Sequence, residues 1–403
     1  MGGLRVAGMF VLFFAADCVA EDWPCYRGPN NNGVSNETNW NSIWPPEGPP
    51  VAWRFNVGTG YASVVVSDGK LYTVGNSEDV DNVFCLDAAT GKLLWKRSYA
   101  SPVDPNEFDG GPTSTPTVRG GSVFTLSRTG DLFRLDAMTG EVNWTVNVPE
   151  MTSIRIPGWG FSGSPWVSDS AVIVNVGDAG VGLSIDDGSV LWASADKDSG
   201  YSSFVPLDQD SEERLVFGSA RSYVCIDSRT GKEQWRQRWL TTFGCNAADP
   251  VIVDGQVFLS SGYNRGSALL DVASGKPQVV WKHKEFQTQL VSSVLCSGRL
   301  YGANGSVAEG ASLACLGLPD GELLWDAEQF NIGGLIAAGD RLITMSDDGV
   351  LRVVEPENAG PVIRSEFRVF DEQCWTMPVL CNGRIYCRGA GGALVCVDVQ
   401  VLQ

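Results

Sequence analysis

Leu86-Asp87-Ala88-Ala89-Thr90-Gly91-Lys92-Leu93-Leu94-Trp95 recurs along this chain, and its recurrence dictates the architecture. Close copies run from Leu135 to Trp144 and from Ile226 to Trp235. In each copy an alternating segment ends at Asp-x-x-Thr-Gly, and a second segment that carries a Trp begins. The Gly supplies the positive φ of a hairpin turn, and the Asp or Thr side chain bonds back to turn amides. Each copy therefore predicts two strands joined by a tight turn.

A second turn signal precedes these copies by about twenty residues. It reads Ser67-Asp68-Gly69-Lys70 in the first unit, and similar turns stand at 253–256, 296–299 and 381–384. Two hairpins per period make a four-stranded unit, and a repeat period of roughly 20–50 residues is typical of solenoids and propellers. No helical pattern of useful length interrupts the series. The sequence therefore predicts an all-β propeller of four-stranded antiparallel blades.

The tryptophans give the number of blades, because they recur about every 42–49 residues. An eighth, degenerate unit follows Asp347-Asp348-Gly349, with Arg364 at the position of the Trp. The segment 51–55 has the pattern of an outermost strand, whereas the last unit, which ends near Asp398, lacks one. We therefore predict an eight-bladed β-propeller in which the N-terminal strand completes the C-terminal blade and leaves no exposed sheet edge. The recurring residues are Trp53, Trp95, Trp144, Trp192, Trp235, Trp281 and Trp325.

The N-terminus predicts export. Arg5 precedes an apolar stretch at 6–16, and the small residues of Cys18-Val19-Ala20 follow it, as in a secretory signal peptide over residues 1–20. The stretch is too short to span a bilayer, and no other long apolar run exists, so no transmembrane segment is expected. Residues 21–50 then form an N-terminal extension, and 51–403 form a single propeller. We expect a periplasmic or secreted monomer; whether Cys18 carries a lipid stays open.

Composition and charge exclude some classes of partner. Hydrophobic residues make up 43% of the chain, which excludes a disordered protein. The net charge is −18 and no Lys/Arg cluster interrupts the acidic excess, so neither nucleic acid nor an anionic lipid surface is an expected partner.

The repeat resembles the PQQ-like propeller family, whose Ala-x-Asp-x-x-Thr-Gly-x-x-x-Trp motif occurs in quinoprotein dehydrogenases and, in degenerate form, in the outer-membrane assembly factor BamB. Further features resemble the PQQ-binding-like propeller proteins of planctomycetes more closely. The resemblance covers nearly the whole mature chain, and it implies that each Trp docks on a Gly-containing turn of a neighbouring blade. The features that resemble the planctomycete proteins are the segments 23–29, 60–63, 111–116, 159–161 and 374–378.

The resemblance also raises a quinoprotein dehydrogenase, which would hold a calcium-bound quinone in the central funnel. Such enzymes carry adjacent cysteines over the cofactor, and here no two cysteines are adjacent. There is no Cys-x-x-Cys-His run for a haem either. We therefore expect neither PQQ nor calcium, and no metal site. A hydrolase that uses carboxylates of the rim stays open as a second enzymatic alternative.

Other chemistry-bearing residues are predicted to be structural. His283 is the one histidine and follows a Trp in an outer strand, so a His-rich zinc site is excluded. The acidic run 208–213 lacks the Gly and distal Glu of a calcium loop, and the Gly-rich 177–182 opens no helix that could cradle phosphate. Six cysteines repeat in register and are expected to be buried hydrophobes: Cys85, Cys225, Cys296, Cys315, Cys381 and Cys396. A disulfide among Cys25, Cys245, Cys374 and Cys387 stays open.

The remaining signal is the loop-rich rim. In a propeller the connections that enter the innermost strands share one face with those between the middle strands, and loops there vary without disturbing the sheets. Aromatic and amide side chains at such positions suit a sugar, a peptide or a protein segment. The sequence therefore predicts a non-enzymatic propeller that binds a protein or polysaccharide of the cell envelope, as a BamB-like scaffold would. The candidate binding residues are Tyr61, Trp159, Phe161, Tyr201, Asn246, Asp249 and Trp375.

Overall fold

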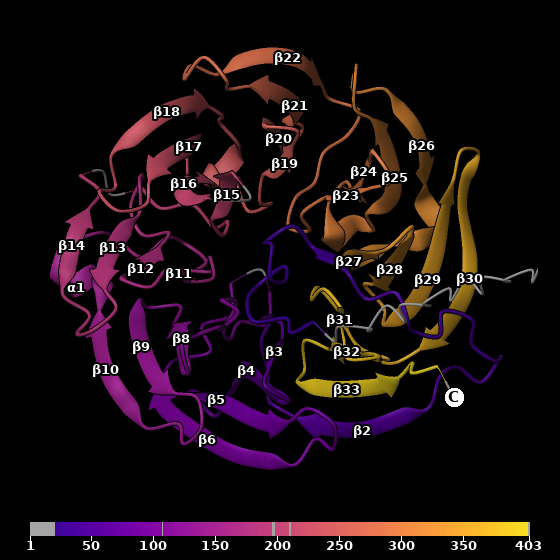
Figure 1. The fold of residues 1–403 in the computed structure, drawn as a ribbon, viewed down its shortest axis with the longest axis horizontal. Coiled ribbons are helices and arrows are strands. Elements are labelled where there is room, and N and C mark those ends of the chain that lie inside the picture. The colour runs from indigo at the N-terminus through magenta and orange to yellow at the C-terminus, as the bar shows by residue number, and fades with distance from the viewer. Residues whose placement is uncertain (1–20, 107, 196–197, 209–210, 402–403) are drawn as a thin grey trace, which may run out of the picture.

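The computed structural model describes residues 21–401 except 107, 196–197 and 209–210. The expected signal peptide, with Cys18, and the centre of the acidic run 208–213 lie outside the described residues. The described chain forms eight antiparallel sheets arranged in a ring (Figure 1), which confirms the predicted eight-bladed propeller. Within the described residues, helical structure is confined to α1 (Val148–Thr152) and three short 3-10 turns, η1 (Thr242–Gly244), η2 (Val307–Glu309) and η3 (Glu328–Phe330).

The first four blades follow the chain from the innermost strand outward. Blade 1 contains β3 (Val65–Ser67), β4 (Lys70–Ser77), β5 (Val80–Asp87) and β6 (Leu93–Ala100). Blade 2 contains β7 (Thr117–Arg119), β8 (Ser122–Leu126), β9 (Asp131–Asp136) and β10 (Val142–Asn147). Blade 3 contains β11 (Trp166–Val167), β12 (Ala171–Val174), β13 (Val181–Ser184) and β14 (Val190–Ala193). Blade 4 contains β15 (Val205–Asp208), β16 (Ser211–Gly218), β17 (Ser222–Asp227) and β18 (Glu233–Arg238).

The last four blades include both terminal strands. Blade 5 contains β19 (Val251–Val253), β20 (Gln256–Ser261), β21 (Gly266–Asp271) and β22 (Gln278–His283). Blade 6 contains β23 (Val294–Cys296), β24 (Arg299–Asn304), β25 (Ser312–Gly317) and β26 (Leu323–Ala327). Blade 7 contains β27 (Ile332–Ala338), β28 (Arg341–Ser346), β29 (Val350–Glu357) and β30 (Gly360–Arg368), with β1 (Val34–Ser35) added. Blade 8 contains β31 (Val379–Cys381), β32 (Arg384–Arg388), β33 (Ala393–Asp398) and β2 (Val51–Asn56).

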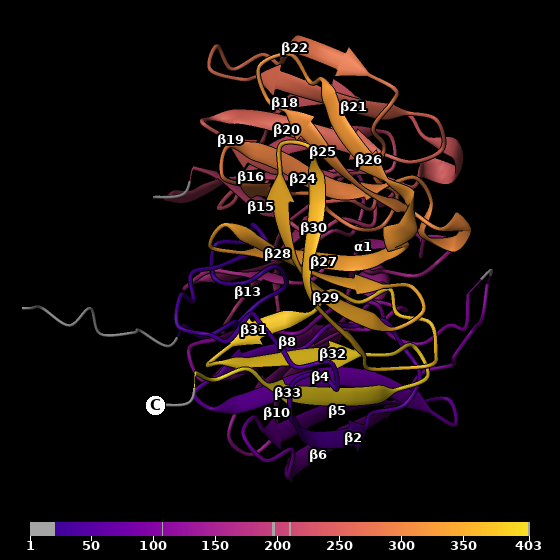
Figure 2. The ribbon, with the colours of Figure 1, turned by 90° about the vertical axis from the view of Figure 1, so that its right-hand side faces the viewer.

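The two ends of the chain close the ring. β2 pairs antiparallel with β33, and Trp53 lies opposite Cys396 and Phe55 opposite Leu394. Both views place β2 alongside β33 at the outer edge of blade 8 (Figures 1 and 2). The prediction that the N-terminal strand completes the last blade is therefore confirmed.

Tryptophans occupy the gaps between neighbouring blades. The indole of Trp95 donates from Nε1 to the Ala137 carbonyl oxygen of blade 2, at 3.0 Å. The Trp95 ring lies against the turn glycine Gly140. A Cβ added to Gly140 would come within 2.6 Å of a ring atom of Trp95. Equivalent hydrogen bonds to the next blade are made by Trp53, Trp144, Trp281 and Trp325. Trp192 packs against Gly231 but makes no such hydrogen bond. Trp235 does not pack against the turn glycine of the next blade, Gly275, because no atom lies within 4 Å of a Cβ added there.

Blade 7 departs from the repeat at the position of its Trp. The bulge between β29 and β30 leaves Arg364 unpaired and sets Ser365 opposite Val353, as the bulge of blade 1 sets Trp95 opposite Cys85. The prediction that Arg364 stands at the position of the Trp is therefore wrong by one residue. Ser365 is buried, and its hydroxyl accepts from the backbone N–H of Trp44 at 2.8 Å and donates to the Ser42 carbonyl oxygen at 2.9 Å.

The N-terminal extension is built into the propeller. Trp23 pairs with Val66 of the innermost strand β3, and Val118 of β7 donates its N–H to the Pro24 carbonyl oxygen. β1 then runs parallel to β27, and Trp40 and Trp44 join the core between blades 7 and 8. The indigo segment in Figure 1 follows this path from the middle of the ring out to β2. Residues 21–50 thus cross the central channel and fill the gap that blade 7 leaves.

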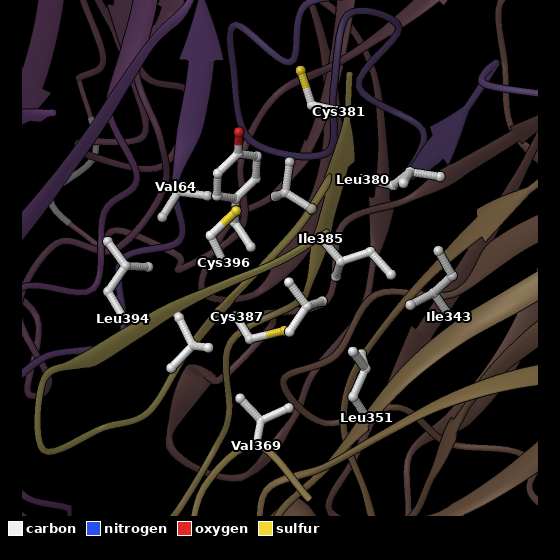
Figure 3. Packing of buried hydrophobic residues seen from close by; sticks show 14 of the residues in the cluster. Val64, Ile343, Leu351, Val369, Leu380, Cys381, Ile385, Cys387, Leu394 and Cys396 are labelled. Atoms are coloured by element: carbon white, nitrogen blue, oxygen red, sulfur yellow. The ribbon is translucent and has the colours of Figure 1, made fainter. Parts of the chain in front are cut away.

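The six cysteines that repeat in register are buried, as predicted. In Figure 3 the sulfur atoms of Cys387 and Cys396 lie within the packed core of blade 8, near Val369 and Leu394. Burial raises the pKa of the Cys396 thiol to about 12. Cys245, Cys374 and Cys387 are free thiols, so no disulfide joins these three, and the Cys25 thiol donates to the Gly28 carbonyl oxygen.

Candidate functional site

A cavity of about 300 Å³ opens on the loop-rich face of the ring. It brings together five of the seven candidate residues, which come from blades 1, 3, 4, 5 and 8: Tyr61, Trp159, Tyr201, Asp249 and Trp375. All but Asp249 are partly exposed, as residues that face an open cavity should be. The complete aromatic lining is Tyr26, Tyr61, Phe108, Trp159, Tyr201, Tyr263 and Trp375.

The aromatic rings are held by their polar ends. The Tyr61 hydroxyl donates to Gln373 Oε1 at 2.9 Å, and Trp375 Nε1 donates to Asp347 Oδ1 at 2.6 Å. Ring centroids of Tyr61 and Trp375 are 5.6 Å apart, and those of Trp159 and Tyr201 are 5.7 Å apart. Burial raises the pKa of both tyrosine hydroxyls to about 12, so each stays protonated at neutral pH. The polar ends of Tyr61 and Trp375 are therefore occupied, and both residues line the cavity.

The other two candidates lie behind the wall. Phe161 is buried in the core shared by blades 2 and 3. Asn246 is also buried: its amide nitrogen donates to the carbonyl oxygens of Ser219 and Trp239, and its Oδ1 accepts from the Ser261 hydroxyl. Their side chains support the loops and do not line the cavity.

Sequence reasoning missed several residues of the lining. Tyr26 lies in the segment 23–29, which resembles the planctomycete propeller proteins. No residue type or spacing in that segment indicates that it enters the channel. Phe108 and Asn106 stand in the long connection before β7, where no repeat register applies. The one available signal was the length of that connection, since functional loops outrun the repeat that carries them.

The floor of the cavity is the N-terminal extension. Arg27 is buried, and its Nη2 donates to the carbonyl oxygens of Asn32 and Ser293 at 2.8 and 2.7 Å. A second cavity, of about 280 Å³, lies on the other side of this segment and is lined by Arg27 and residues 29–32. The extension therefore divides the channel, and the aromatic cavity is blind.

Asp249 and Arg27 meet at this floor. Their closest atoms, Oδ2 and Nε, are 3.9 Å apart, which is too long for a hydrogen bond. Burial consequently outweighs the attraction of Arg27, and the pKa of Asp249 rises to about 6. Within the described residues, neither Oδ2 nor Nε has a hydrogen-bond partner.

A belt of polar side chains, mostly hydroxyls, lines the channel along blades 1 to 6. It comprises residues that each stand two positions before an innermost strand, namely Ser63, Thr115, Ser164, Ser203 and Ser292, with Asp249 at the equivalent position of blade 5. The Ser63 N–H donates to Thr115 Oγ1 at 2.8 Å, and the Ser164 N–H donates to Ser203 Oγ at 3.0 Å. The belt continues from Ser203 N–H to Asp249 Oδ1 and from Asp249 N–H to Ser292 Oγ. We name this set the hydroxyl belt.

The residues present do not fit a calcium-bound quinone. Among the described residues, Asp249 is the one carboxylate that lines the cavity, and it faces a buried guanidinium instead of further ligand oxygens. Among residues 21–401, as far as they are described, no three His, Cys, Asp or Glu side chains converge as metal ligands. Tyr26 of the N-terminal extension closes the inner end of the cavity, and Arg27 lies behind it and lines the second cavity.

A groove of about 920 Å³ leads outward from the cavity between blades 3 and 4. Tyr201 lines both spaces. Phe243 stands at their boundary with 71% of its surface exposed and a φ of 62°. Its ring meets Trp159 and Tyr263 edge to face, at centroid distances of 6.0 Å each.

The remaining sequence candidates have structural surroundings. The His283 ring stacks on Trp281, and its Nε2 lies 2.7 Å from the Asp320 carbonyl oxygen of the next blade. The Gly-rich segment 177–182 runs from the connection after β12 into β13 and begins no helix. No helix of the described chain is long and apolar enough to cross a bilayer.

Fold, repeat and closure define the class of this protein: an eight-bladed PQQ-like β-propeller with the cavity on its axis. The family model described as "Outer membrane protein assembly factor BamB" matches residues 45–158 and 101–310, and the chain belongs to this family. The closer resemblance to planctomycete proteins stays a prediction.

Relatives of two kinds share part of the sequence. The outer membrane protein assembly factor BamB of Burkholderia pseudomallei is 25% identical over 258 residues, which cover 61% of each chain. The chain thus spans less than two thirds of that relative. The dehydrogenase subunit of the quinone alcohol dehydrogenase of Gluconacetobacter polyoxogenes is 33% identical over 142 residues, 33% of this chain and 18% of that protein.

Solved structures agree on the fold. BamB from Moraxella catarrhalis superposes with a TM-score of 0.63 at 16% identity and covers 87% of this chain and 99% of its own. A europium-containing methanol dehydrogenase superposes with a TM-score of 0.70 at 14% identity, over 94% and 89%. Identities this low establish a shared propeller and nothing about activity.

Proposed function

We propose that this protein is a non-enzymatic scaffold of the cell envelope that docks a partner protein on its loop-rich face. The name of the BamB relatives describes an assembly factor of the outer membrane, and membership of that family supports the same kind of role here. The observation that carries the proposal is Phe243, an exposed aromatic side chain on a strained backbone.

A bulky residue with a positive φ costs about 1–3 kcal/mol and persists where function favours it. Ile156 and Leu240, which line the groove beside Phe243, are also about half exposed. An aromatic anchor amid apolar neighbours is typical of an interface hot spot. The groove also carries more arginines than carboxylates, namely Arg155, Arg221, Arg236 and Arg238 against Asp178 and Asp198. In a chain of net charge −18, this local excess favours a partner segment with apolar and acidic residues.

The test is site-specific photo-crosslinking in the native envelope. A photoreactive phenylalanine analogue replaces Phe243, and in a matched control it replaces Met138, which is 67% exposed in the turn between β9 and β10. We expect a light-dependent protein adduct at position 243 and none at 138. Adducts of equal yield at both positions, or no protein adduct at 243, would refute the docking site.

The dehydrogenase alternative has a separate test. A ligand that binds only the folded state raises the melting temperature in proportion to RT ln(1 + [L]/Kd). We expect saturating quinone with calcium to leave the melting temperature unchanged. A reproducible rise, together with alcohol oxidation beyond a heat-inactivated control, would replace the scaffold with an enzyme.

A further inference from the structure

The blind cavity contains groups that docking at Phe243 does not use. Because the N-terminal extension closes its inner end, a polymer can enter it by one end but cannot thread through it. Its volume of about 300 Å³ is at the lower limit of small-molecule sites. The cavity is therefore shaped for the terminal unit of a chain or for a small free ligand.

Its walls offer rigid aromatic faces. The polar ends of Tyr61, Trp159 and Trp375 are each bound to another protein group, so these rings are oriented before any ligand arrives. Such preorganisation reduces the entropy lost on binding. The negative face of an aromatic ring attracts the weakly positive C–H groups of a saturated ring.

The hydroxyl belt supplies the complementary polar contacts. Thr115 Oγ1 and Ser203 Oγ each accept an N–H from the preceding blade, and each keeps its own hydrogen to donate. Ser164 contributes only its backbone N–H to the belt, so its hydroxyl is not needed by a neighbouring amide. A purely apolar ligand would leave these groups without partners at a cost.

The charges at the floor favour a neutral ligand with hydroxyl groups. A cation is opposed by Arg27, and an anion is opposed by Asp249 and by Asp347 behind Trp375. Asp249 lines the cavity and its Oδ2 has no hydrogen-bond partner within the described residues, so this atom can accept a hydrogen bond from a ligand hydroxyl. We propose that the cavity binds the terminal residue of a neutral carbohydrate chain. This goes beyond the docking of a protein at Phe243 and, apart from Tyr201, uses different side chains.

The test is isothermal titration calorimetry of the purified protein with cellotriose, maltotriose, mannotriose and chitotriose, and with trigalacturonate as a charged counterpart. We expect at least one neutral trisaccharide to bind with a Kd below about 1 mM, and trigalacturonate to bind at least about tenfold more weakly. Tyr201→Ala and Trp375→Leu should each weaken binding at least about tenfold, and Ser164→Ala about threefold. Met138→Ala, on the opposite face, should leave binding unchanged.

Each variant is first checked for an unchanged melting temperature, and Ser164→Ala removes no group that the fold uses. Three results overturn the proposal: no neutral trisaccharide binds up to about 10 mM, trigalacturonate binds as tightly, or Tyr201→Ala and Trp375→Leu bind like the wild type. Crosslinking at position 243 is independent of all three, so failure here leaves the protein-docking scaffold standing.

Discussion

The gap between blades 1 and 2 and the gap between blades 7 and 8 are filled in different ways. In the first, Trp95 of the repeat reaches across and bonds to Ala137, as the recurring motif implies. In the second, the Trp is replaced by Ser365, and Trp44 of the N-terminal extension is held there by the Ser365 hydroxyl. Both tryptophans are buried, at 9% and 8% exposure.

The difference teaches that the space between two propeller sheets has to be filled, while the filler need not belong to the repeat. Close packing explains the requirement, since an empty gap loses its dispersion contacts and leaves a cavity. A repeat unit can therefore lose its Trp where another segment supplies one. The same extension that fills this gap also forms the floor of the aromatic cavity.

The largest expected effect concerns the repeat side of this comparison. Trp95→Ala should lower the free energy of unfolding by about 3–5 kcal/mol, because it removes a buried aromatic side chain and leaves a cavity. Trp325→Ala, at a half-buried indole with the same hydrogen bond, should cost less than about 2 kcal/mol. Urea unfolding measures both values. A loss below about 1 kcal/mol for Trp95→Ala would show that the indole does not stabilise the interface.

The extension side of the comparison is tested with Trp44→Ala. We expect a loss of about 2–4 kcal/mol, somewhat below Trp95→Ala, because the extension can detach locally and relieve part of the strain. Ile43→Ala, at a neighbouring side chain with 57% exposure, should change the free energy of unfolding by less than about 0.5 kcal/mol. Urea unfolding gives the energies, and limited proteolysis within 21–50 reports detachment. If both variants behave alike, the extension is not part of the cooperative core.

A smaller, pH-dependent effect tests the other end of the extension, at Arg27. Because the pKa of Asp249 is raised to about 6, the native state keeps this proton to higher pH than the unfolded chain, whose carboxyl titrates near 3.9. The resulting stabilisation is complete below about pH 4 and is lost as the pH rises through 6. Relative to Asp249→Asn, which cannot ionise, the wild type should therefore lose about 2–3 kcal/mol between pH 4 and pH 7. A gain over this range would mean that the attraction of Arg27 exceeds the effect of burial.

Turns and strands were readable from sequence because their determinants are local. Asp87, Thr90 and Gly91 form the turn that their residue types predict, with Asp87 Oδ1 accepting from the Thr90 N–H and hydroxyl. The error at Arg364 has a local cause as well, because the hairpin between β29 and β30 is longer than that of blade 1. Val354 pairs with Ile363, nine positions on, whereas Leu86 pairs with Leu93, seven positions on. Without a Trp to mark the position, the prediction was displaced by one residue, from Ser365 to Arg364.

The candidate site was only partly readable. Tyr61, Tyr201 and Trp375 stand before innermost strands, where a repeat fold has to place its loops on one face. Phe161 occupies the same kind of position, yet its side chain points into the core, since the direction of a loop side chain depends on its neighbours. Tyr26 was not predicted as a site residue because its position depends on contacts with blades far along the chain.

The sequence by itself determined the blades, their number and the closure of the ring, because turn chemistry, strand alternation and the recurring Trp act over a few residues and repeat. Only the tertiary structure decided that the extension crosses the channel, that Ser365 and Trp44 meet, and that one acidic residue interrupts a belt of hydroxyls above a buried arginine. Those features join residues hundreds of positions apart, and their geometry exists only once the ring has closed and its axis has become an enclosed space.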